Sequence, residues 1–174
     1  MAFINNSFRF KKTKPSNDWV VKNIKVHRIL SIADIDNRWI IGDVKCVVNV
    51  SSDPNSEVCR VLQAKNINCY WFPMTECNSD MGLHSIFGAL QILRGYIELR
   101  ESCIIHCYGG NNRSMVVYES LYYLYFSNWP TPIEDTKVFE NSQKGHLPSI
   151  DKYIKFLTDM KDNRNIENCF EGCY

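Results

Sequence analysis

The chain has 174 residues, 45% hydrophobic and 22% charged, and its 20 Lys and Arg against 19 Asp and Glu leave a formal net charge of +1. This length suits one domain, and the near balance of charge gives no indication of nucleic-acid binding. No apolar run reaches the roughly 20 residues that span a bilayer, and none follows the basic N-terminus as in a signal peptide. We therefore expect an intracellular, cytoplasmic protein without a membrane span.

Strand-like and helix-like segments alternate along the chain. Residues 1–18 are polar and basic and are predicted to form an N-terminal arm before a single domain, 19–174. Apolar and β-branched runs predict strand-like segments at 26–32, 39–41, 44–50, 67–72 and 102–106. Helical spacing predicts helices over 57–66, 83–98, 115–126 and 149–160, with a further helix starting near Pro132. This order indicates an α/β fold with a central, mainly parallel sheet flanked by helices.

Cysteine occurs eight times, at positions 46, 59, 69, 77, 103, 107, 169 and 173. Several lie in strand-like apolar runs, and no secretory signal is apparent, so reduced thiols are favoured over a disulfide framework. Cys169 and Cys173 have no nearby Cys or His pair that would complete a zinc tetrahedron. No metal site is expected.

The segment from His106 to Ser114, with the sequence His-Cys-Tyr-Gly-Gly-Asn-Asn-Arg-Ser, lies between a predicted buried strand and a predicted helix. Small residues allow successive backbone N–H groups to turn inward, and the next helix adds the positive end of its dipole. Such donors stabilise a thiolate and can move a cysteine pKa from about 8.5 into the range ~3.5–7.5. Arg113 adds a planar fork suited to two phosphoryl oxygens, so Cys107 and Arg113 are predicted to share one anion. The intervening loop consists of Tyr108, Gly109, Gly110, Asn111 and Asn112.

This His-Cys-(five residues)-Arg-Ser string resembles the signature loop of the protein tyrosine phosphatase superfamily, in its dual-specificity branch. The resemblance covers roughly residues 26–160, including the strand at 44–50, Tyr-Trp-Phe-Pro at 70–73 and Gly-His-Leu-Pro at 145–148. It implies the cysteine-phosphatase fold and a phosphatase catalytic domain that needs neither metal nor cofactor. In that family the cysteine forms a phosphocysteine, the arginine binds the phosphoryl oxygens, and water hydrolyses the intermediate.

The resemblance assigns roles by position. Cys107 would be the nucleophile and Arg113 the phosphate ligand. His106 would order the loop and tune the thiolate, and Ser114 would help the cysteine to leave during hydrolysis. At Asn112 the family more often has glycine or serine; because asparagine accepts the left-handed backbone region, the loop is still expected to close.

The general acid is expected after the segment that ends at Pro73. Glu76, 31 residues before Cys107, has the matching position, whereas Asp80 has the family's usual side chain. Both stay candidates, with Glu76 favoured. Either would protonate the leaving oxygen and later deprotonate the attacking water.

Phosphotyrosine in proteins, together with phosphoserine or phosphothreonine, is the leading substrate class. Related phosphoinositide and RNA 5′-phosphatases commonly place positive charge inside the loop, and this loop has none before Arg113. Such a phosphatase is one alternative, and a catalytically weak pseudophosphatase that binds phosphorylated partners is another. Cys46, Cys69 and Cys103 are candidates for a reversible disulfide with Cys107, although core packing is favoured for them. The oligomeric state is left open.

Overall fold

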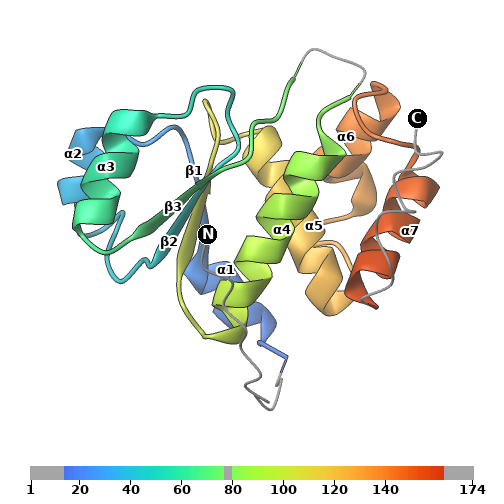
Figure 1. The fold of residues 1–174 in the computed structure, drawn as a ribbon. Coiled ribbons are helices and arrows are strands. Elements are labelled where there is room, and N and C mark those ends of the chain that lie inside the picture. Colours follow the sequence, from blue (N-terminus) through green and yellow to red (C-terminus); the bar gives the residue numbers. More distant parts are fainter. Residues whose placement is uncertain (1–13, 77–79, 163–174) are drawn as a thin grey trace.

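The computed structural model describes residues 14–76 and 80–162. Within them, one sheet is covered by helices on both faces (Figure 1). All its strand pairs are parallel, in the order β1-β4-β2-β3. The strands are β1 (Ile24–His27), β2 (Cys46–Asn49), β3 (Asn68–Trp71) and β4 (Cys103–His106). The predicted α/β fold with a parallel central sheet is confirmed.

Helices form a layer on each side of the sheet (Figure 1). One layer contains α2 (Ile32–Asp36) and α3 (Ser56–Ala64). The other contains α4 (Leu83–Glu98), α5 (Arg113–Phe126), α6 (Lys137–Gln143) and α7 (Ile150–Lys161). A short helix, α1 (Asn17–Asn23), precedes β1, and a 3₁₀ turn, η1 (Ile133–Asp135), precedes α6. Helix α1 starts at Asn17, within the last residues of the predicted N-terminal arm.

Side chains alternate between the two faces of the sheet, as the pleat of a strand requires. Cys46 and Val48 of β2 belong to the larger core, which also contains residues of α4, α5 and α7. Val47 belongs to the smaller core, with Leu62 of α3. All four residues of β2 and of β4 are buried, so the near-continuous apolar runs of these strands reflect burial on both faces.

The structure differs from the sequence prediction between β1 and β2. Residues 39–41 form a turn, with Trp39 84% exposed, rather than a strand. The β-rich segment at 26–32 is a strand only as far as His27, because Ser31 and Asp34 form a capping box that starts α2. Reciprocal capping satisfies two backbone donors, and this local gain outweighs the β propensity of the neighbouring residues.

The carboxyl ends of the parallel strands lie at one edge of the sheet, where open α/β sheets usually bind their ligands. At this edge β4 leads into Cys107 and the loop before α5. Among residues 14–76 and 80–162, no helix combines the length and apolar character needed to cross a membrane.

Candidate active site

The loop between β4 and α5 is held against the end of β1. The Ile29 N–H donates to the Tyr108 carbonyl at 2.9 Å. Gly110 has φ 75°, and a Cβ placed there would lie 2.8 Å from the Arg28 nitrogen. Both the left-handed backbone and the close approach require glycine. The loop therefore closes at Gly110, whereas Asn112 has φ −122° and is not left-handed.

The Cys107 thiol lies at the base of this loop and is almost completely buried. Its Sγ is 3.2 Å from the Ser114 Oγ. Burial alone would raise the pKa of Cys107. Hydrogen bonds from the Ser114 hydroxyl and from the backbone amides of Ser114, Gly110 and Asn112 outweigh burial, so the thiol pKa lies below its ordinary value. The loop thus directs hydrogen-bond donors at the sulfur, as a thiolate cradle requires, and the nucleophilic role of Cys107 stays a prediction.

The Arg113 side chain is also buried, and it extends toward the segment after β3. Its Nη1 donates to the Met74 carbonyl at 3.1 Å. Its Nε lies 3.1 Å from Oε1 of Glu76 but makes no hydrogen bond, so this contact is a charge–charge pair. One guanidinium therefore joins the signature loop to the segment that carries the predicted acid.

The two acid candidates have different surroundings. Glu76 is brought to Arg113, and its side chain is 42% exposed. Asp80 is exposed, and its carboxylate accepts the backbone N–H of Gly82 at 2.7 Å, which places it at the start of α4. Residues 77–79 between them lie outside the described part of the chain. The geometry favours Glu76 as the carboxyl group next to the site.

His106 is the last residue of β4 and is 1% exposed, with Asn49 and His27 as its neighbours on the adjoining strands. Burial lowers the pKa of His106 to about 4, and the Cys107 backbone opposes this only in part. The imidazole is therefore neutral near pH 7. The ring lies beside the nucleophile, and its buried Nδ1 makes no hydrogen bond in the structure. The loop-ordering role that the resemblance implies therefore stays a prediction.

The remaining loop side chains point to the surface. Tyr108, Gly109 and Asn111 are exposed, whereas Gly110 and Asn112 are half-buried. The loop thus acts through its backbone amides more than through its side chains. Two contributors were not identified from the sequence: the Met74 carbonyl, which has no sequence signal, and Asn141, which contacts Asn112 from α6.

The candidate partner cysteines are too far from Cys107 for a disulfide in this arrangement. Cys46 and Cys103 face each other at the amino ends of β2 and β4, four residues before Cys107, or about 13 Å along a strand. Cys69 is in register with Ile104 but lies two strands away, a separation of similar size. Disulfides require Cα atoms within about 7 Å. Cys46, Cys59, Cys69, Cys103 and Cys107 are free thiols, and Cys77, Cys169 and Cys173 lie outside the described residues.

Among the described residues, no group of three or more His, Cys, Asp or Glu side chains could hold a metal ion. Arg113, the loop amides and the start of α5 supply positive charge at the site.

Comparison with known proteins finds no matching family model and no curated relative. Solved structures do share the fold. PTPMT1 is 12% identical with a TM-score of 0.62, and the match covers 83% of this chain and 98% of PTPMT1. PTPMT1 in complex with PI(5)P is 12% identical with a TM-score of 0.60, and the match covers 83% and 95%. The core catalytic domain of the PP-IP phosphatase SIW14 from S. cerevisiae, in complex with citrate, is 17% identical with a TM-score of 0.49, over 84% and 85%.

At these identities the match with PTPMT1 establishes the fold alone, and the expected cysteine-phosphatase fold is confirmed. The roles that the resemblance assigns to the residues of the signature loop stay predictions.

Proposed function

We propose that this protein is a metal-independent phosphatase that hydrolyses phosphomonoesters through a phosphocysteine on Cys107. One observation carries the proposal: a buried thiol whose pKa is lowered by the Ser114 hydroxyl and by loop amides, next to a buried arginine. The donors that stabilise the sulfur anion also suit the oxygens of a phosphoryl group. A cysteine that only packed in the core would not need hydrogen bonds from the loop amides.

The reaction then follows in two steps. In the first, the Cys107 thiolate attacks phosphorus, the bond to the leaving oxygen breaks, and a carboxyl group gives that oxygen a proton. In the second, a water molecule attacks the phosphocysteine after the same carboxylate takes its proton, and the P–S bond breaks. The Ser114 hydroxyl, 3.2 Å from Sγ, stabilises the departing thiolate.

Glu76 is our candidate for the carboxyl group. Its Oε1 lies 3.1 Å from the Arg113 Nε, a donor that makes no hydrogen bond in the structure and that a bound phosphate would use for bidentate binding. A phosphate bound to this donor would therefore lie beside the Glu76 carboxyl group. This position suits the proton transfer that we propose for Glu76.

Phosphoproteins are the proposed substrates, with phosphotyrosine first and phosphoserine or phosphothreonine next. The loop has no cation before Arg113. Lys137, at the start of α6, and Lys144, just after it, are both paired with Glu140. This partial neutralisation gives little attraction for additional phosphates. A phosphoinositide is the second candidate, because the fold matches that of PTPMT1 in complex with PI(5)P.

We also propose that the protein works in a reducing compartment such as the cytoplasm. A low-pKa thiolate is the form of cysteine that oxidants attack most readily. Reducing conditions keep such thiols available for catalysis.

The test is hydrolysis of p-nitrophenyl phosphate in the presence of a chelator, with vanadate as inhibitor and Cys107→Ser as control. The proposal expects chelator-resistant, vanadate-sensitive turnover that is lost in Cys107→Ser. A panel of phosphopeptides, phosphoinositides and 5′-triphosphorylated RNA then ranks the substrate classes by kcat/KM. Tight phosphopeptide binding without any turnover would instead identify a pseudophosphatase and overturn the proposal.

A further inference from the structure

Asn112 is the N-cap residue of α5, but its side chain does not cap the helix. Its backbone carbonyl accepts the first helical hydrogen bond, from Val116 N at 2.9 Å, as an N-cap should. The carboxamide makes no hydrogen bond to the first turn of the helix. This is unusual, because asparagine is among the strongest N-cap residues and normally accepts an N–H two or three positions later. For Asn112 those donors are the amides of Ser114 and Met115.

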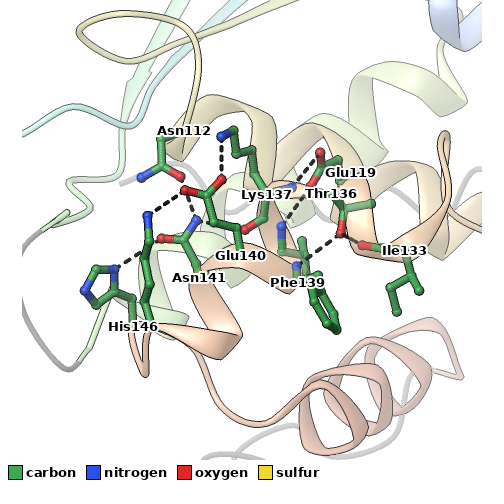
Figure 2. Close-up of polar contacts among 11 residues, drawn as sticks. Asn112, Glu119, Ile133, Thr136, Lys137, Phe139, Glu140, Asn141 and His146 are labelled. Atoms are coloured by element: carbon green, nitrogen blue, oxygen red, sulfur yellow. Dashed lines mark hydrogen bonds and ion pairs between the residues drawn. The ribbon is translucent and has the colours of Figure 1, made fainter.

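The carboxamide of Asn112 is held by Asn141 of α6 instead (Figure 2). The Asn141 Nδ2 donates to the Asn112 Oδ1 at 2.6 Å and to the Lys137 carbonyl at 2.8 Å. A carbonyl only accepts hydrogen bonds, so the amide nitrogen of Asn141 must face Lys137, which leaves its Oδ1 for the His146 Nδ1 at 3.3 Å. Asn141 is 1% exposed. Burial of a carboxamide is costly unless its hydrogen bonds are satisfied, and here three partners satisfy it.

The amide of Ser114 is one of the donors that lower the pKa of Cys107. If Asn112 capped α5 in the ordinary way, its Oδ1 would compete with the thiolate, and with a phosphoryl group, for this N–H. The contact with Asn141 directs Oδ1 toward α6 and so removes the competitor. Because Asn112 is a residue type that normally caps a helix, its side chain must be held away from α5 if the first-turn amides are to stay available.

Resting on the phosphatase function proposed above, we propose that Asn141 is a positioning residue: it holds the Asn112 side chain away from α5, so that the first-turn amides stay directed at the reacting sulfur and phosphate. It does not touch substrate. The same residue also anchors the segment after α6, since its backbone carbonyl accepts the N–H groups of His146 and Leu147. These backbone bonds do not depend on the Asn141 side chain, so a substitution can remove the carboxamide alone.

The test measures alkylation of Cys107 by iodoacetamide across a pH range, read by peptide mass spectrometry so that other cysteines do not contribute. In Asn141→Leu, which has a similar shape but no amide, Asn112 is free to cap α5. Losing one hydrogen bond to a charged group corresponds to roughly a tenfold effect. We therefore expect the pKa of the Cys107 thiol to rise in this variant, so that its alkylation rate at pH values below that pKa, and the kcat/KM for p-nitrophenyl phosphate, each fall by up to about tenfold.

The double variant Asn112→Ala/Asn141→Leu separates positioning from a structural role. Alanine keeps the backbone amide of residue 112 but cannot cap, so thiol reactivity should recover most of what Asn141→Leu loses. A merely structural role of Asn141 would give no recovery. Ser142→Ala is the matched control on α6, because its hydroxyl donates to the Pro148 carbonyl and not to the loop; it should leave the alkylation profile unchanged.

The outcomes distinguish this inference from the proposed function. An ordinary thiol pKa at Cys107 in the wild type would contradict the function itself. A lowered pKa in the wild type that is unchanged in Asn141→Leu, or a double variant no more reactive than the single one, would overturn only the role of Asn141. If Asn141→Leu does not fold, Asn141→Ala removes the same carboxamide without steric conflict and replaces it in both comparisons.

Discussion

The two ends of the parallel sheet each bury a cysteine, with opposite consequences for the thiol. At the amino end, Cys46 is fully buried next to Cys103, and this neighbour together with burial raises the pKa of the Cys46 thiol. At the carboxyl end, Cys107 is 1% exposed, yet its pKa is lowered. Both side chains are almost inaccessible to solvent, and burial by itself raises the pKa of each thiol, so burial does not explain why the pKa of Cys107 is lowered.

What differs is the supply of hydrogen-bond donors. At the amino end of β2, the neighbouring thiol of Cys103, burial, Cys69 and Glu101 all raise the pKa of the Cys46 thiol. The carboxyl end of β4 is followed by a glycine-containing loop and the start of a helix, whose amides and hydroxyl converge on Cys107. A buried position becomes reactive when the backbone around it presents unpaired N–H groups.

The largest effect is expected from exchanging the nucleophile itself. Cys107→Ser should lower phosphatase activity by about 10⁴-fold or more, because a serine hydroxyl does not ionise under these donors as a thiol does. Cys46→Ala, at the other end of the sheet, is the matched control and should retain wild-type kcat. Comparable losses in both variants would show that the two ends do not differ in function.

The next effect concerns the acid beside Arg113. Glu76→Gln should lower kcat by about 10³-fold for an alkyl phosphate, whose leaving group needs a proton, and much less for p-nitrophenyl phosphate. It should also remove the limb of the pH–rate profile that reports an essential acid. Asp80→Asn is the comparison variant. If Asp80→Asn shows the larger loss and Glu76→Gln keeps the acid limb, the acid has been misassigned.

A direct chemical comparison of the two thiols should show Cys107 reacting faster, by up to about 10²-fold. At about pH 6.5 an ordinary thiol of pKa 8.5 is only about 1% ionised, whereas a thiol of lowered pKa has a larger thiolate fraction. Reactivity of Cys107 toward iodoacetamide should fall only as pH drops through its lowered pKa, and Cys46 should react slowly throughout. Both rates, read by peptide mass spectrometry, should become equal in denaturant. Equal rates in the folded protein would contradict the proposed contrast.

The smallest effect comes from Glu119 of α5, a buried carboxylate with two backbone donors. It accepts the N–H groups of Lys137 and Val138 at 3.0 and 2.9 Å, but burial outweighs them and raises its pKa above 4.5. Because the folded-state pKa of Glu119 is raised, the free energy of unfolding of the wild type falls as pH rises from the unfolded-state pKa to the folded-state pKa.

Glu119→Gln removes this dependence, so it provides a test of the same balance between burial and donors. Relative to the variant, the wild-type free energy of unfolding should decrease as pH rises from 4.5 to about 7. Urea unfolding at the two pH values measures this difference. A wild type that gains stability relative to Glu119→Gln over this range would reverse the sign of the argument.

Most elements of the fold could be predicted from the sequence because their hydrophobic period is local. The helix at 83–98 was predicted with the bounds of α4, and the strand at 44–50 contains β2. The turn at 39–41 could not be predicted in this way, because its apolar residues Trp39, Ile40 and Ile41 match a strand pattern. In the structure they pair with no strand and form a turn. Choosing between Glu76 and Asp80 had the same difficulty, because it depends on where Arg113 lies.

The sequence alone determined the chemistry of the loop. Cys107, Gly110, Arg113 and Ser114 lie within eight consecutive residues between a strand and a helix, and backbone geometry over so short a distance brings them together. Only the tertiary structure decided what supports this loop: the contact of Gly110 with β1, the Met74 carbonyl and Glu76 at Arg113, and Asn141 at Asn112. These partners are 29 or more residues away in the chain, and packing of separate elements, which no local pattern encodes, places them at the site.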